Sequence, residues 1–100
     1  MSTMLLSIIL LVNPQPAGFK FVVTAEPYTK FVILQKGRIA EPNTLYRTQP
    51  LQRNMKVEFE VRWLENDEIR HKFIMVEFCP GQIVIVSVKL PKVRPIIANC

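Results

Sequence analysis

A strict alternation of apolar and charged side chains over residues 56–64 constrains the fold of this chain more than any other feature. The apolar set is Val57, Phe59, Val61 and Trp63, and the charged set is Lys56, Glu58, Glu60 and Arg62. A period of two is typical of a β-strand with one buried face and one solvated face. We therefore expect a half-buried strand here, with its charged side chains in water.

The polar residues 65–68 that follow predict a turn, because Asn66 and Asp67 tolerate left-handed backbone conformations. If the chain folds back at this turn, Phe59 lies opposite Ile74 and the apolar side chains of both strands share one face. The same register sets Trp63 opposite Arg70, close enough for a cation–π contact.

A second turn is expected at residues 79–82, where Gly81 supplies the positive φ of a type II turn. That turn type is not the favoured one for tight hairpins, so the last strand either pairs with its predecessor or crosses to a second sheet. Residues 82–90 are apolar on both sides, with isoleucines on one and Val84, Val86 and Val88 on the other. Such a strand requires cover on both faces, from a second sheet, the N-terminal segment or a partner.

The chain of 100 residues is expected to form one domain without helices, because eight prolines interrupt its apolar runs. We predict an all-β fold, a small antiparallel β-sandwich of immunoglobulin-like or prealbumin-like type with about seven short strands. The sandwich is expected to span residues 19–90. Residues 91–100 form an extended arm that is an edge strand, a docking arm or disordered.

Residues 1–18 comprise an apolar run, residues 4–12, and a proline-rich linker. The run is too short to cross a bilayer as a helix. It has the length of a signal-peptide core, but its β-branched residues equally favour a buried, added strand. The first alternative predicts a secreted or envelope-associated protein with membrane proximity through this run. The second predicts a cytoplasmic one.

The net charge of +5 permits anionic partners, but the basic residues are scattered, which favours a dispersed solvated surface. The two cysteines, Cys79 and Cys100, either pair or leave a buried thiol at Cys79. With one histidine they are too few soft ligands for a zinc site. We expect no metal and no cofactor.

The residue types of catalysis do not converge in the sequence. His71 is the only histidine, and the hairpin register sets it opposite Arg62 on the wet face. Glu58 and Glu60 fit the solvated side of an amphipathic strand better than a pair of catalytic carboxylates. Ser87 has no histidine or acid at a telling spacing, and no glycine-rich phosphate loop is present. We predict that the protein is not an enzyme and binds no small-molecule substrate.

Residues 19–90 resemble a family of short β domains found in planctomycete secreted and envelope proteins, and are loosely similar to PEGA-type surface domains. The matching positions are Gly37 at a glycine turn, Tyr46, Thr48, Pro50 and Leu51 in an extended segment, and Gly81 before the last strand. The chain departs from the family pattern at Thr44, Gln49, Asn54 and the pair Asp67-Glu68. The resemblance implies a small β-sandwich without catalytic residues.

These features together predict a structural or protein-interaction module, a small accessory subunit of a larger and envelope-associated assembly, or a homo-oligomer. The candidate interaction residues are Trp63, Arg70, Tyr46, Val84, Val86 and Val88. The alternative is a basic β-barrel that binds RNA or single-stranded DNA, since Tyr46-Arg47 and Arg62-Trp63 set rings beside cations. Adjacent strand residues face opposite sides, however, which separates most such rings from their cations.

Overall fold

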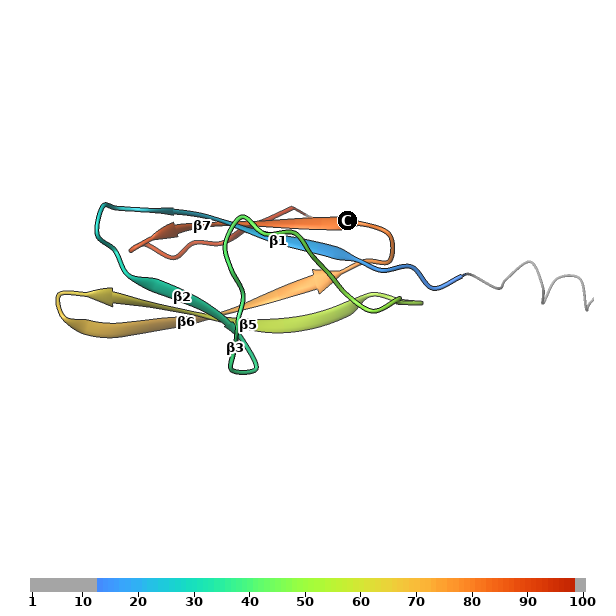
Figure 1. Cartoon of the computed structure of the whole chain (residues 1–100), viewed down its shortest axis with the longest axis horizontal. Coiled ribbons are helices and arrows are strands. Elements are labelled where there is room, and N and C mark those ends of the chain that lie inside the picture. Colours follow the sequence, from blue (N-terminus) through green and yellow to red (C-terminus); the bar gives the residue numbers. More distant parts are fainter. Residues whose placement is uncertain (1–12, 99–100) are drawn as a thin grey trace, which may run out of the picture.

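The computed structural model describes residues 13–98, which form two four-stranded β-sheets packed face to face (Figure 1). The strands are β1 (Gly18–Ala25), β2 (Phe31–Gln35), β3 (Arg38–Ile39), β4 (Tyr46–Arg47), β5 (Met55–Glu65), β6 (Glu68–Phe78), β7 (Ile83–Leu90) and β8 (Ile96–Ile97). One sheet has the order β4-β1-β7-β8 and the other β3-β2-β5-β6. The predicted all-β sandwich is confirmed, with eight strands instead of about seven. The predictions for residues 4–12 fall outside the described residues.

The β5–β6 hairpin has the register that the sequence predicts. Phe59 lies opposite Ile74, and Trp63 lies opposite Arg70. The turn consists of Asn66 and Asp67, which both adopt positive φ angles of 52° and 63°. Two central residues with positive φ match the twist of the flanking strands, and for this reason a two-residue loop is stable here.

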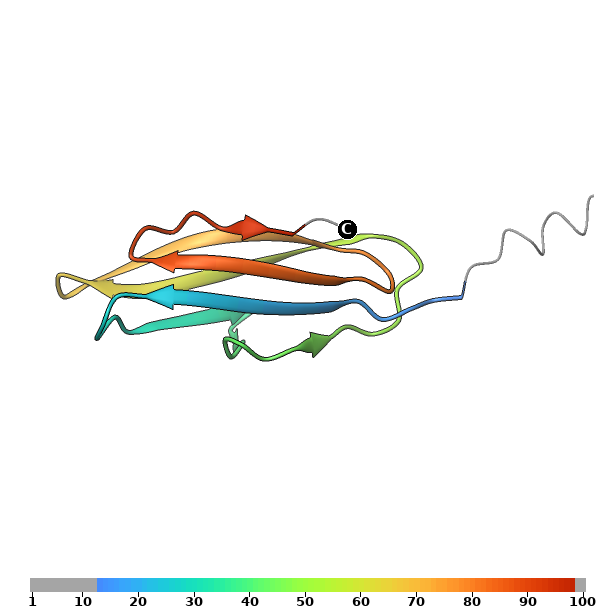
Figure 2. The ribbon, with the colours of Figure 1, turned by 90° about the horizontal axis from the view of Figure 1, so that it is seen from above.

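After β6 the chain crosses to the opposite sheet, which decides between the two alternatives for the last strand. The turn closes with a hydrogen bond of 3.0 Å from the Gln82 N–H to the Cys79 carbonyl, and Gly81 has a φ of 75°. β7 then runs parallel to β1, with Gly18 opposite Ile83 (Figure 2). The other strand pairs of the two sheets are antiparallel, as predicted, and the β1–β7 pair is the exception, because both strands start from the same end of the molecule. Cys79 is disulfide-bonded, and Cys100 lies outside the described residues.

The segment after β7 turns back along the same sheet. β8 pairs with β7 in antiparallel fashion, with Ile96 opposite Ser87. Val93, between the two strands, is buried in the core. Of the three alternatives for the C-terminal segment, the edge strand is the one that the described residues form.

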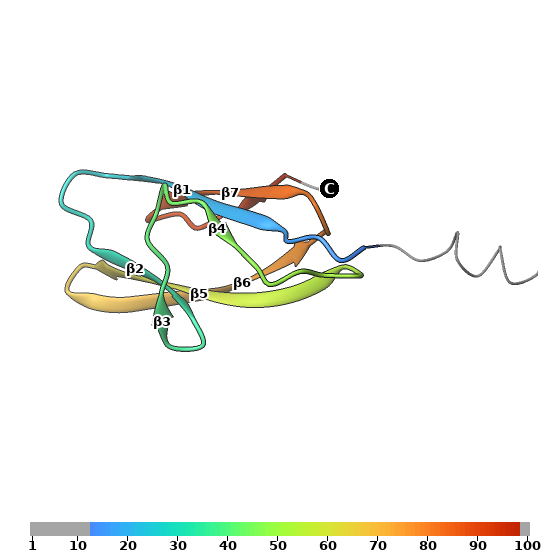
Figure 3. The same ribbon diagram turned by 45° about the vertical axis from the view of Figure 1, so that its right-hand side comes forward.

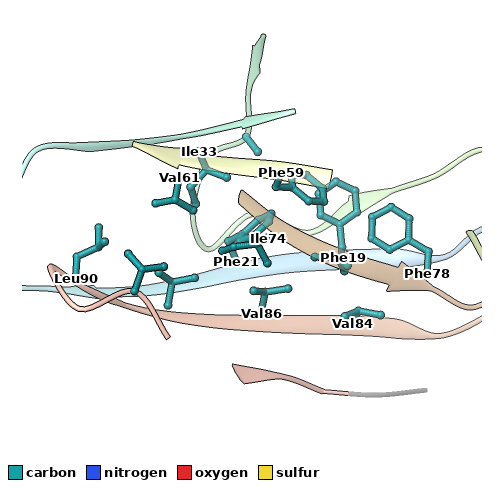
Figure 4. Close-up of a cluster of buried hydrophobic side chains, with 14 of the residues drawn as sticks. Phe19, Phe21, Ile33, Phe59, Val61, Ile74, Phe78, Val84, Val86 and Leu90 are labelled. Atoms are coloured by element: carbon teal, nitrogen blue, oxygen red, sulfur yellow. The ribbon is translucent and has the colours of Figure 1, made fainter. Parts of the chain in front are cut away.

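The core between the sheets is centred on Phe19. Its ring lies 5.0 Å from the ring of Phe78 and 5.4 Å from that of Phe59, both on the opposite sheet, and 5.2 Å from that of Tyr46. Val84 and Val86 point into the same layer (Figure 4). The second sheet therefore covers the inner face of β7, whereas its outer face stays uncovered within residues 13–98.

The two phenylalanines of the β5–β6 hairpin provide a test of this arrangement. Phe59 is fully buried, whereas Phe73 is 53% exposed on the outer side. We expect Phe59→Ala to lower the free energy of unfolding by about 3–5 kcal/mol. The matched change Phe73→Ala is expected to lower it by less than about 1 kcal/mol. Urea unfolding measures both, and equal losses would contradict the assigned faces.

Candidate interaction surfaces

The outer side of the β5–β6 hairpin carries a band of exposed apolar side chains, which we call the hairpin face. It consists of Leu64, Ile69, Phe73 and Met75, all classed as exposed. Phe73 and Met75 alternate with Ile74 and Val76, which are buried, so the two exposed residues lie on the outer side. They are 53% and 52% exposed. Large side chains of this kind next to each other are typical of contact surfaces.

An ion cluster borders the hairpin face. The Glu60 carboxylate lies with Oε1 2.9 Å from Nη2 of Arg62 and with Oε2 3.0 Å from Nδ1 of His71. The His71 ring in turn packs edge-on against Phe73, with 5.5 Å between the ring centroids. The hydrogen bond from Arg62 is the main cause that holds the pKa of Glu60 below its ordinary value. Glu60 is therefore charged at neutral pH, which suits a structural partner better than a general acid.

A hollow lies where β2 leaves β5. The two strands pair only between residues 31–34 and 60–63, and the β2–β3 hairpin then projects away from the sandwich (Figure 3). This divergence leaves a cavity of about 430 Å³. Its walls include Leu34, Phe73, Glu58 and Glu60. The hollow thus continues the hairpin face. Its apolar walls are combined with the carboxylates of Glu58 and Glu60 and with the lysines Lys36 and Lys56.

β6 is an edge strand of its sheet in the described part of the chain, and it is eleven residues long. Long edges invite pairing with other chains, and charged residues that point inward are a common protection. Lys72 has this role, because its Nζ donates a hydrogen bond of 3.0 Å to the Val93 carbonyl beneath the strand. This hydrogen bond ties the middle of the edge strand to the C-terminal segment.

Trp63 and Arg70 face each other as predicted, but their polar groups have other partners. The Trp63 indole N–H donates to the Glu65 carboxylate at 3.3 Å, and the Arg70 guanidinium pairs with Glu68 at 3.0 Å. Trp63 is half-buried and helps to line a shallow hollow of about 390 Å³ with Leu64 and Ile69. Trp63 therefore adjoins the hairpin face.

The other four candidate residues serve the fold. Tyr46 stacks on Phe19, and its hydroxyl oxygen accepts a hydrogen bond of 2.8 Å from the Glu41 N–H. Val84, Val86 and Val88 are buried between the sheets. In this structure these valines have no surface to offer to a partner.

Sequence reasoning missed Phe73 and Met75 as surface residues. Once the hairpin register was fixed, alternation with Ile74 could have assigned both to the outer side. It also missed the Glu60–His71 contact, because the register sets His71 opposite Arg62 and Glu60 is only a diagonal neighbour.

Comparison with protein-family models, with curated proteins and with solved structures finds no match for this chain. Over residues 13–98, no three His, Cys, Asp or Glu side chains come together in a way that could hold a metal ion. The same residues contain no helix long and apolar enough to cross a membrane. The proposal below therefore depends on the sequence of the chain and on the geometry of its described residues.

The ion cluster makes a prediction about pH. A carboxyl whose pKa is lowered by folding adds stability above its ordinary value of 4.5, and this stability is lost as the pH falls through the lower folded value. We expect carboxyl NMR titration to place the pKa of Glu60 below 4.5, and Arg62→Gln to raise it. Arg70→Gln, which removes the pair with Glu68, is the matched control and is expected to leave Glu60 unchanged. If the pKa of Glu60 is the same with and without Arg62→Gln, the result would contradict the proposed ion cluster.

Proposed function

We propose that this chain is a non-catalytic β-sandwich module that binds a protein partner through the hairpin face, as a small accessory subunit of a larger assembly. The observation that carries the proposal is the exposure of Phe73 and Met75 beside the hollow at β2. Aromatic residues, methionine and arginine are the types enriched at protein interfaces. Here Phe73 and Met75 share an outer surface with Arg62 and His71.

The ion cluster supports binding in preference to catalysis. Both carboxylate oxygens of Glu60 already have partners, and its lowered pKa keeps it in the charged form. A general acid or base works best with a pKa near the operating pH. The cluster instead fixes the outer surface around Phe73, because His71 contacts both Glu60 and the Phe73 ring. A rigid surface loses less entropy when a partner binds.

An envelope location for the assembly is part of the proposal. The resemblance to planctomycete envelope domains motivates it. The disulfide bond of Cys79 adds support, because disulfides persist mainly in oxidising compartments.

Binding of single-stranded nucleic acid has less support. Such binding needs exposed rings next to cations on one surface. Phe19, Phe21 and Tyr46 of the β4-β1-β7-β8 sheet all belong to the core or pack against it. Of the exposed rings in residues 13–98, Tyr28 lies in a turn, and Phe73 lines a hollow together with the carboxylates of Glu58 and Glu60, which would repel phosphate groups.

A photo-reactive phenylalanine analogue at position 73 of the full chain tests the proposal. In the source cells, we expect one defined protein adduct from position 73, and none from the same analogue at position 28. Mass spectrometry identifies the partner, including a second copy of the chain. With the purified partner, Phe73→Ser combined with Met75→Ser is expected to weaken binding at least about tenfold.

The matched control is Ile39→Ser, which removes an exposed apolar residue from β3. It is expected to leave the affinity unchanged. Absence of a position-specific adduct, or equal affinity of the double variant and the control, would contradict the proposed function.

A further inference from the structure

The acidic residues of this protein are unequally divided between the two sheets. The strands of the β4-β1-β7-β8 sheet contain three cations, Lys20, Arg47 and Lys89, and no aspartate or glutamate. The strands of the other sheet contain five glutamates, three in β5 and two in β6. All charged residues within the strands of the first sheet are therefore cations.

The outer side of this sheet is also apolar, and we call it the cationic face. It consists of Lys20, Leu45, Arg47, Ile83, Ile85, Lys89 and Ile96. Ile83, Ile85 and Ile96 are 51%, 42% and 72% exposed. They lie outside because their strand neighbours Val84, Val86 and Ile97 pack into or against the core.

Gly18 makes part of this surface continuous. A Cβ atom at Gly18 would lie 3.0 Å from Cγ1 of Ile83 and 3.4 Å from Cδ1 of Leu45. Leu45 and Ile83 thus approach each other over the bare backbone of β1. Their side chains form one apolar surface at the end of the sheet where β1 and β7 begin.

We propose that the cationic face docks on a membrane surface that carries anionic headgroups. Lysine and arginine near such a surface are attracted by its negative potential, and exposed aliphatic side chains gain from leaving water at the interface. Lysine side chains can also keep their charge at headgroup level while their apolar stems contact the bilayer. The strands of the face supply both kinds of residue without an acidic group. The nearby Glu26, which follows β1, lines a hollow together with two cations, Lys89 and Lys92.

The chemistry of the face favours lipid over a protein partner. Its exposed apolar residues are all aliphatic, whereas the energetic centres of protein interfaces are rich in tryptophan, tyrosine and arginine. A symmetric contact with a second copy would set this face against itself, so that its cations would meet cations. Like charges across an interface oppose binding.

The position of the N-terminal sequence agrees with this orientation. Residues 4–12, which are apolar except for Ser7, precede Asn13 in the sequence, and β1 starts at Gly18, directly beside Ile83 and Leu45. In sequence, the apolar run therefore lies shortly before the strand that begins at the apolar end of the cationic face.

Vesicle co-sedimentation of the full chain tests the proposal. We expect binding to phosphatidylcholine vesicles that contain phosphatidylserine, weaker binding at high salt, and little binding to pure phosphatidylcholine. Lys20→Gln and Lys89→Gln are each expected to weaken binding about fivefold. Ile83→Ser combined with Ile85→Ser is expected to weaken it further, while the urea midpoint confirms that each variant is folded.

The control Phe73→Ser combined with Met75→Ser alters the opposite face and is expected to leave vesicle binding unchanged. The two proposals can therefore fail separately. Vesicle binding can be absent while the hairpin face binds its protein partner, and vesicle binding can be present while no partner of the hairpin face is found. Three results would overturn the inference. The chain could bind neutral and anionic vesicles equally, it could bind anionic vesicles with the same affinity in all variants of the cationic face, or it could bind no vesicles at all. The second result would assign the binding to residues outside this face.

Discussion

The packing of Phe19 against two rings of the opposite sheet, stacked on Phe78 and tilted against Phe59, is the contact that joins the two layers of the sandwich. Phe19 belongs to β1, whereas Phe59 and Phe78 belong to β5 and β6. These contacts hold two sheets together that share no backbone pairing. Aromatic rings contribute a large buried area, and offset or tilted contacts add to it. A chain with a modest core relies on such contacts, because small domains bury a smaller share of their surface.

The sandwich buries one side of each sheet and leaves two chemically different surfaces outside. On the β5–β6 hairpin, Phe73 and Met75 lie beside the ion cluster of Glu60, Arg62 and His71. On the β1–β7 pair, isoleucines lie beside Lys20 and Lys89 without acids. A module with these two surfaces would connect a protein partner on one side with an anionic lipid surface on the other. This division also explains why a net charge of +5 does not require nucleic acid as the partner.

Much of the fold followed from local patterns in the sequence. The alternation over residues 56–64 and the turn at Asn66-Asp67 specify the β5–β6 register, since a shift by one residue would expose Phe59 and Val61. The residues of the candidate interaction surface were harder to predict from the sequence. Tyr46 was predicted as an interaction residue, yet its ring stacks on Phe19 and its hydroxyl oxygen accepts a hydrogen bond from the Glu41 N–H. That role depends on a contact between segments distant in sequence, which local periodicity does not contain.

Local sequence patterns are enough to specify that the chain is made of β-strands, where the main hairpin turns, and that β7 carries apolar residues on both sides. Which side of β7 is buried follows from the packing of the two sheets. A strand apolar on both sides has no periodic signal to choose between Val84 and Ile83, so the choice depends on what packs against it. Because the chain crosses after Cys79 to lie parallel to β1, the valines meet Phe19 and its neighbours, and the isoleucines remain outside.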